Sequence, residues 1–236
     1  NYGFDTFGDI FTPRQLVALT TFSDLVGEAR ARVKRDALTI DLPDDGKPLA
    51  TGGIGATAYA DAVAVYLGLG ISRLADAQNS LCQWGPSADQ TQHLFRRQAV
   101  PMVWDYAEMN PFCSVTSNFS ASVEWVAKVI EFLPENTLGG QAEQRDARQA
   151  TAAFVSTDPP YYDNIGYADL SDFMYIWMRR ALQGTYPDLM GTVLVPKQAE
   201  LIATPYRNNG DMDAATRYFE RGLSDVFESL RAETDP

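Results

Sequence analysis

The sequence predicts an α/β fold that is rich in helices, and three observations lead to this prediction. Apolar residues recur every three or four positions along several long stretches, which is typical of amphipathic helices. A short apolar stretch at 152–156 has the composition of a strand. It leads into Asp-Pro-Pro-Tyr at 158–161, a stiff polar turn placed where open α/β sheets bind ligands. One strand, a turn and then helices favour an α/β layer over an all-helical bundle.

Four stretches carry the helical pattern. Thr12, Pro13 and Gln15 form a helix-start signature, in which threonine caps the first turn and glutamine closes a capping box. Pro134 is expected to end the third helix, because proline cannot continue one. The segments 41–55 and 135–149 are rich in polar residues, with prolines or glycines, and are interpreted as connections. The four apolar faces are Leu16, Leu19, Phe22, Val26 and Ala29; Val63, Ala64, Leu67, Ile71 and Leu74; Val123, Val126, Ala127, Ile130 and Leu133; and Ala215, Phe219, Gly222, Val226 and Leu230.

Length and charge limit the possible classes of function. With 236 residues, of which 45% are hydrophobic, the chain can bury a substantial core. Its net charge of −12 argues against a surface that binds nucleic acid over its whole extent, because phosphate binding needs clustered Lys and Arg. Any DNA contact is therefore expected to be local. The short basic groups, which could touch phosphates or simply be solvated helix ends, are Arg30, Arg32, Lys34 and Arg35; Arg96 and Arg97; and Arg179 and Arg180.

Cysteine and histidine usage predicts chemistry without a metal. Cys82 and Cys113 are far apart and lack the spacing of a disulfide framework or a zinc site. His93 is the sole histidine, which excludes a histidine-rich metal centre in this chain. No stretch reaches the roughly 18 apolar residues that a membrane span needs, and no secretion signal is recognisable. We expect a protein of the reducing cytoplasm that has no membrane partner.

The turn at 158–161 has the chemistry to receive an exocyclic amino group. Two prolines fix their φ angles and remove two backbone donors, while the preceding Asp158 is pushed toward an extended conformation. The Asp158 carboxylate and the Pro159 carbonyl could accept the two N–H groups of an amine, with Tyr161 stacked on its ring. The nitrogen lone pair would then point at an electrophilic methyl group, so that orientation does most of the catalysis. The alternative is a plain strand-to-helix turn with proline in the first helical turn.

Asp-Pro-Pro-Tyr after an apolar strand resembles the motif of amino-methyltransferases that modify adenine N6 or cytosine N4 in DNA after flipping the base. The wider likeness is to large prokaryotic proteins described as adenine-specific DNA methylases, and it rests on residues 11–16, 102–112 and 156–182. The resemblance implies a partial Rossmann-like methyltransferase sheet, with the motif at the C-terminal end of a strand, and S-adenosyl-L-methionine as methyl donor. The catalytic residues that it implies are Asp158, Pro159, Pro160 and Tyr161.

The resemblance also implies cofactor contacts outside the motif. Phe11, Thr12 and Pro13 are similar to an element called motif X, which packs against the cofactor in some of these enzymes, although the capping box also explains them. The cofactor loop of the family, Asp-Pro-Phe-x-Gly-x-Gly, does not occur in this sequence. The nearest candidate is Thr51–Gly55, for which a helix start is the favoured interpretation.

Further polar and aromatic residues could complete the substrate side of the site. Tyr162, Asp163 and Asn164 follow the motif and could contact the target base, with helix capping as the alternative for the last two. Asp105 and Glu108 could meet polar atoms of cofactor or substrate, or be surface carboxylates.

The expected organisation is a mainly helical region at 1–150, between the cofactor and target motifs, and the target-motif part of the methyltransferase domain at 151–236. A start at Asn1 and an end directly after a helical pattern suggest a segment of a longer protein. The first hypothesis is methylation of adenine N6 in DNA, with other domains or subunits of a larger methylase as partners. The alternatives are a cytosine N4 or RNA amino-methyltransferase, and a catalytically incomplete DNA-binding or assembly module.

Overall fold

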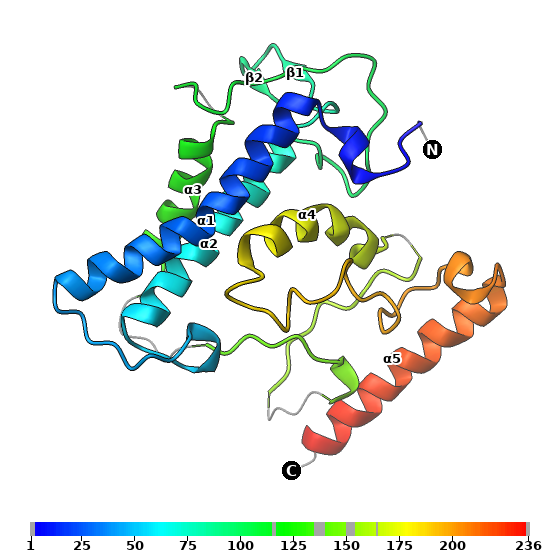
Figure 1. Ribbon diagram of the computed structural model, residues 1–236. Coiled ribbons are helices and arrows are strands. Elements are labelled where there is room, and N and C mark those ends of the chain that lie inside the picture. The colour runs from blue at the N-terminus through cyan, green and yellow to red at the C-terminus, as the bar shows by residue number, and fades with distance from the viewer. Residues whose placement is uncertain (1–2, 115–116, 135–139, 150–153, 164, 235–236) are drawn as a thin grey trace. The chain divides into compact units, whose positions relative to one another are not determined.

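Helices dominate the computed structural model, which describes residues 3–114, 117–134, 140–149, 154–163 and 165–234 (Figure 1). Within these ranges the only strands are β1 (Trp84–Gly85) and β2 (Gln90–Thr91), an antiparallel pair with Trp84 opposite Thr91. The α-helices are α1 (Pro13–Thr39), α2 (Ala56–Ala77), α3 (Phe119–Glu131), α4 (Tyr167–Leu182) and α5 (Met212–Thr234). Short 3-10 turns are η1 (Phe7–Ile10), η2 (Leu49–Thr51), η3 (Ala147–Gln149) and η4 (Pro205–Asn208).

The α/β prediction is therefore wrong for the part of the chain that the structure describes. A Rossmann-like sheet needs several parallel strands covered by helices, whereas β1 and β2 form one short antiparallel pair. The strand expected at 152–156 is not found at 154–156, and residues 152 and 153 lie outside the described ranges. A strand forms only by pairing with a neighbour, and the two prolines that follow have no N–H to donate. Phe154 is accordingly 88% exposed.

Helices form at all four predicted stretches, and the capping box is confirmed. The predicted apolar face of α3 is not buried, because Ile130 is 38% exposed and Leu133 lies beyond the helix end and is 56% exposed. The Thr12 side chain accepts a hydrogen bond from the Gln15 backbone N–H at 3.2 Å, and Gln15 Oε1 accepts one from the Thr12 N–H at 2.9 Å. Pro13 is the first residue of α1, where a missing N–H costs nothing. α3 ends at Glu131, before Pro134. Local side-chain chemistry thus sets the helix boundaries.

The glycine-rich stretch before α2 is a helix start, as favoured from the sequence. Gly55 is the N-cap of α2. A side chain at Gly53 would come within 2.1 Å of the Lys47 carbonyl oxygen, and one at Gly55 within 2.6 Å of the Pro43 carbonyl oxygen. These glycines are explained by the close approach of the preceding loop.

The chain divides into two compact units. Unit 1 comprises residues 1–134 and 171–195, and unit 2 comprises residues 135–170 and 196–236. α4 contributes its first turn to unit 2 and the remainder to unit 1.

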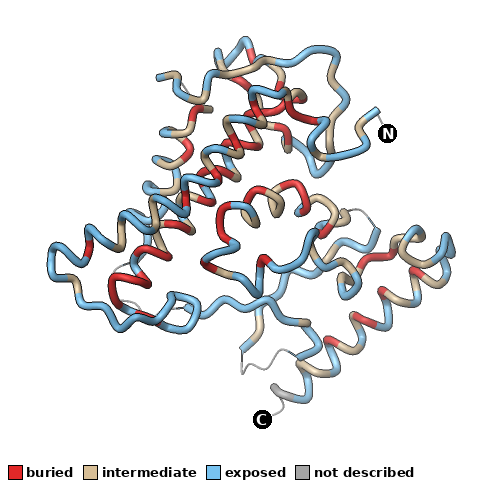
Figure 2. The backbone as a smooth tube through the Cα atoms, in the orientation of Figure 1, coloured by how far each residue is buried: buried red, intermediate tan, exposed pale blue. Residues whose placement is uncertain are grey.

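Unit 1 is built around an aromatic and aliphatic core. α1 and α2 lie side by side, and α3 packs against α2 (Figure 1). Buried positions recur along α2 and along the unit 1 part of α4 (Figure 2). Phe173 of α4 is 1% exposed and meets the rings of Phe7, Phe11 and Phe95 at centroid distances of 5.2 to 6.3 Å.

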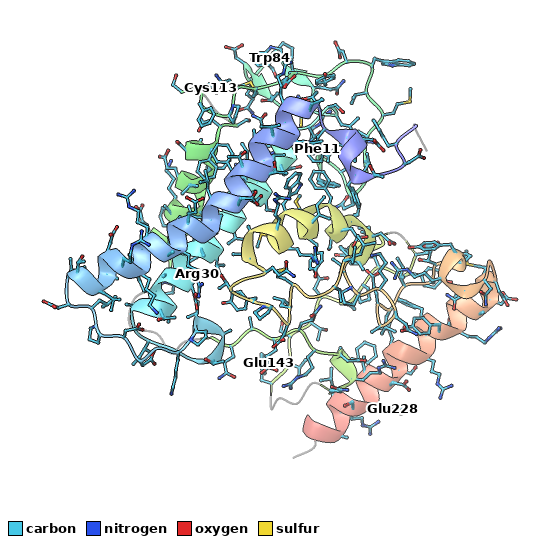
Figure 3. The ribbon with its side chains drawn as sticks, in the orientation of Figure 1. Phe11, Arg30, Trp84, Cys113, Glu143 and Glu228 are labelled. Carbon is cyan, nitrogen blue, oxygen red and sulfur yellow. The ribbon has the colours of Figure 1, made fainter. Side chains whose placement is uncertain are left out.

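A buried ion pair joins α1 to α2 in unit 1. Arg30 belongs to α1 and is labelled in Figure 3. Its Nε lies 2.5 Å from Oδ1 of Asp61, whose side chain is fully buried. The other carboxylate oxygen of Asp61 accepts the Leu49 N–H at 2.9 Å. Asp61 of α2 therefore binds both Arg30 of α1 and Leu49, which lies in the connection between the two helices.

Unit 2 buries fewer apolar side chains than unit 1. α5 packs against η3 and η4 and buries Ala215, Phe219 and Val226, which belong to the predicted face. No helix among the described residues is long and apolar enough to span a membrane.

Candidate functional site

The Asp-Pro-Pro-Tyr segment is irregular and leads into a turn at Tyr162 and Asp163. It presents to solvent hydrogen-bond acceptors that described donors leave largely unoccupied. Asp158 and Pro159 are exposed, and Tyr161 is 52% exposed. Within the described residues the Asp158 carboxylate meets only the Tyr161 hydroxyl, at 3.5 Å, the long limit for a hydrogen bond. No described donor reaches the Pro159 carbonyl. The two acceptors that an exocyclic amino group would require are both accessible.

Tyr162 fastens this turn to α5. Its φ of +40° is uncommon outside glycine, and such a conformation persists only where the surroundings fix it. The Tyr162 carbonyl accepts the Ala203 N–H at 2.9 Å, and its hydroxyl lies 2.7 Å from Thr216 Oγ1. The Tyr162 ring meets Phe219 edge-on, with the centroids 5.2 Å apart. These contacts fix Tyr162 in place, and the ring of Tyr161 is the less constrained of the two.

A polar cluster centred on Arg207 holds the segment that follows the turn. Arg207 donates to Asp169 Oδ2 at 2.7 Å, to Glu200 Oε2 at 2.6 Å and to the Tyr206 hydroxyl at 3.0 Å. Glu200 Oε1 accepts the Ala168 N–H at 3.0 Å, in the first turn of α4. A carboxylate is favourable at this end of a helix, because the first N–H groups lack partners within it. Arg207 therefore ties η4 to the start of α4.

The charges of this cluster are mutually stabilised. Burial alone would lower the pKa of Arg207, but its hydrogen bonds to Glu200 and Asp169 raise that pKa above the usual value. Burial alone would raise the pKa of Asp169, yet the hydrogen bonds from Tyr206 and Arg207 lower it overall. Arg207 and Asp169 thus remain charged at neutral pH.

Of the two residues after Tyr162, the structure describes only Asp163. Asp163 is exposed beside the turn, and Asn164 lies outside the described residues. The cap on Ala168 comes from Glu200, which is distant in sequence and carries no helix-start signature.

The two upstream stretches of the resemblance, 11–16 and 102–112, meet at the start of α1. Glu108 accepts hydrogen bonds from the Thr12 hydroxyl at 3.1 Å and from Arg14 at 3.2 and 2.9 Å. The hydrogen bonds from Arg14, the largest influence, lower the pKa of Glu108. Phe11 instead faces the core, where it is 6% exposed and stacks on Phe173. Asp105 is exposed.

A pocket of about 380 Å³ opens beside this first turn of α1. Gln15, which lines it, is 3% exposed, and its Nε2 has no hydrogen-bond partner among the described residues. An unpaired buried donor costs about 1 to 3 kcal/mol, so an acceptor that could reach Nε2 would be favoured. The atom is closed to solvent, so the Gln15 side chain would have to turn toward the pocket to meet an acceptor such as the carboxylate of S-adenosyl-L-methionine. The glycine-rich loop of the methyltransferases that the sequence resembles is missing, so the fit extends to this polar end of the cofactor alone.

Several of the basic residues that could have contacted phosphates form ion pairs with carboxylates of the same unit. Arg30 pairs with Asp61, and Lys34 Nζ lies 3.3 Å from Asp44 Oδ2. Arg180 makes two bonds to Asp24, at 2.7 and 2.8 Å. These contacts favour a structural role for the basic groups over phosphate binding.

Sequence reasoning missed Tyr206, Arg207 and Glu200. Their only local signal is a cation next to an aromatic residue in a turn bounded by Pro205 and Gly210. Apart from the bond between the neighbours Tyr206 and Arg207, their partners are seven or more residues away, beyond the reach of periodicity or capping rules.

Among the described residues no group of three His, Cys, Asp or Glu side chains could hold a metal ion. Comparison with protein-family models, with curated proteins and with solved structures gave no match.

Proposed function

We propose that this chain provides the amino-group-acceptor part of an S-adenosyl-L-methionine-dependent methyltransferase that acts on an exocyclic amino group in DNA, with adenine N6 as the first candidate. The observation that carries the proposal is the pair of open acceptors, the Asp158 carboxylate and the Pro159 carbonyl, beside the exposed Tyr161. Tyr162 on one side and the Arg207 cluster on the other hold the segment in place. The sequence resemblance supplies the class of reaction.

The chemistry follows from the acceptors that the turn presents. Asp158 accepts one N–H of the amine and the Pro159 carbonyl accepts the other, while Tyr161 stacks on the heterocycle. This orientation directs the nitrogen lone pair away from the ring and toward the incoming carbon. S-adenosyl-L-methionine, when bound, supplies the electrophilic methyl group. As the new N–C bond forms, the bond from the methyl carbon to sulfur would break and its electron pair would stay on sulfur as a neutral thioether. The nitrogen would release one proton to solvent, and Asp158 would remain a hydrogen-bond acceptor throughout.

Within unit 1, Gln15 is the residue that would bind the polar end of the cofactor, through its unpaired Nε2. Thr12 and Glu108 would support it indirectly, because their hydrogen bond fixes the first turn of α1.

The test is methyl transfer to DNA from a donor with a radiolabelled methyl group, measured in the intact protein. Asp158→Ala removes one of the two acceptors, and we expect incorporation to fall at least about a hundredfold, because orientation supplies most of the catalysis. Glu220→Ala, which removes an exposed carboxylate of α5 in the same unit, should leave incorporation unchanged. Equal activity in wild type and Asp158→Ala would refute the proposal.

A second candidate is a DNA-binding or assembly module that cannot bind cofactor by itself. The missing glycine-rich loop and the lack of a parallel sheet among the described residues favour it. Calorimetric titration of this chain with S-adenosyl-L-methionine separates the candidates, because micromolar binding that is lost in Gln15→Ala would eliminate the incomplete module. The absence of any heat of binding would favour the module.

A further inference from the structure

A pocket with two tyrosines in its lining lies in unit 2, apart from the motif residues. Its volume is about 390 Å³, large enough for a planar heterocycle. The residues of its lining that could recognise a ligand are Gln198, Glu200, Tyr206, Arg207, Asn208 and Tyr218.

Tyr206 is held rigidly although its side chain faces solvent. The residue is 64% exposed, yet its hydroxyl donates to Asp169 and accepts from Arg207 Nε at 3.0 Å. The Arg207 guanidinium carbon lies 5.5 Å from the ring centroid. Tyr218 is fixed in the same manner, by a 3.0 Å bond from its hydroxyl to the Gln198 carbonyl. A ring that is already immobilised loses little further freedom when a ligand stacks on it.

The charges around this pocket favour an uncharged ligand. Two carboxylates, Asp169 and Glu200, are balanced by two cations, Arg207 and Lys197, so the cluster has no net formal charge. A phosphate would meet no excess of positive charge here.

The polar side chains of the pocket suit the edge of a nucleobase. The Gln198 side-chain amide has no partner among the described residues. Asn208 uses its Nδ2 on the Thr204 carbonyl at 3.1 Å, which leaves its Oδ1 as an acceptor. Side-chain amides of this kind read the donor and acceptor edges of bases. Aromatic surfaces flanked by amides are therefore typical of base recognition.

The pocket shares its scaffold with the motif turn. Ala203, three residues before Tyr206, donates its N–H to the carbonyl of Tyr162. Arg207 and Glu200 reach the start of α4 on the other side of the turn.

We propose that this pocket binds an unpaired nucleobase next to the target base on the same strand, with Tyr206 as the stacking surface. The inference rests on the proposed function, because it takes single-stranded or locally opened DNA as the substrate.

The experiment uses a short single-stranded oligonucleotide that carries one 2-aminopurine, whose fluorescence is quenched on stacking. Cofactor is omitted, so that binding is measured apart from methyl transfer. Tyr206→Ala should weaken binding roughly tenfold and reduce the quenching, as loss of one base-stacking ring does elsewhere. Tyr206→Phe keeps the ring and should retain most of the affinity. Tyr59→Ala, which removes an exposed tyrosine of α2 in unit 1, is the matched control and should bind like wild type.

Three results would overturn the inference: no binding by the wild type, equal binding by wild type and Tyr206→Ala, or equal losses in Tyr206→Phe and Tyr206→Ala with matching falls in Tm. The last result would mean that Tyr206 only supports Arg207. The binding assay is run without cofactor and does not depend on methyl transfer. Failure of methyl transfer with intact, Tyr206-dependent binding would therefore count against the proposed function and leave the pocket standing.

Discussion

The two units of the chain are stabilised by different forces. The large hydrophobic cluster lies wholly in unit 1, where Leu74 and Phe173 are almost completely buried. Unit 2 buries a shorter apolar row along α5 and is held elsewhere by the Arg207 cluster and the contacts of Tyr162. Apolar burial stabilises without regard to charge, whereas the polar cluster depends on every partner being present and charged. The motif thus belongs to the unit whose stability depends more on charged partners.

The largest expected effect is a cavity in unit 1. Phe173→Ala removes a ring that contacts three other aromatic side chains and should lower the free energy of unfolding by about 3 to 5 kcal/mol. Urea unfolding followed by tryptophan fluorescence measures this loss. A loss below about 1 kcal/mol would show that the cluster does not stabilise unit 1.

Removal of the Arg207 cation should lower the free energy of unfolding somewhat less, and only in unit 2. Arg207→Met leaves Asp169 and Glu200 without their partner, and we expect a loss of about 3 kcal/mol that is confined to unit 2. Amide hydrogen exchange should show faster exchange in α5 and little change in α2. Arg207→Lys, which keeps the charge, is the control and should recover part of the protection. Faster exchange in α2 and α5 alike would contradict the separation of the two units.

Acid should weaken unit 2 through Asp169. The folded-state pKa of Asp169 lies below its ordinary value of 3.8, so its stabilising contribution is present above that value and is lost as the pH falls through the folded pKa. The stability difference between wild type and Asp169→Asn should therefore be largest near neutral pH and shrink below about pH 4. Urea unfolding at a series of pH values measures it. A difference that stays constant with pH would show that the Asp169 charge contributes nothing.

The smallest expected effect concerns the cap of α1. Thr12→Ala removes the hydroxyl that accepts the Gln15 N–H and bonds to Glu108, and it should cost about 1 kcal/mol. Thr12→Ser preserves both contacts and should restore most of the stability in the same unfolding assay. Equal stability of all three proteins would mean that the capping box is not energetically significant.

How far the sequence predicted the fold differs from element to element. α1 and its capping box were predictable because their causes lie within a few residues of each other, from Thr12 to Gln15. The expected strand before the motif was wrong because a strand depends on partners elsewhere, and an apolar run such as 154–156 does not reveal whether a partner exists. The Arg207 cluster was unpredictable for the same reason, since its members come together only through the fold.

The most direct test of the central claim is the chemical identity of the methylated product. DNA incubated with the intact protein and a donor with a deuterated methyl group would be digested to nucleosides and analysed by mass spectrometry. The acceptor geometry of Asp158 and Pro159 predicts label on an exocyclic nitrogen, first of all N6 of deoxyadenosine, and no label with Asp158→Ala. Label on N4 of deoxycytidine would keep the mechanism and change the base. Label on a ring carbon, or the same label with Asp158→Ala, would contradict the account.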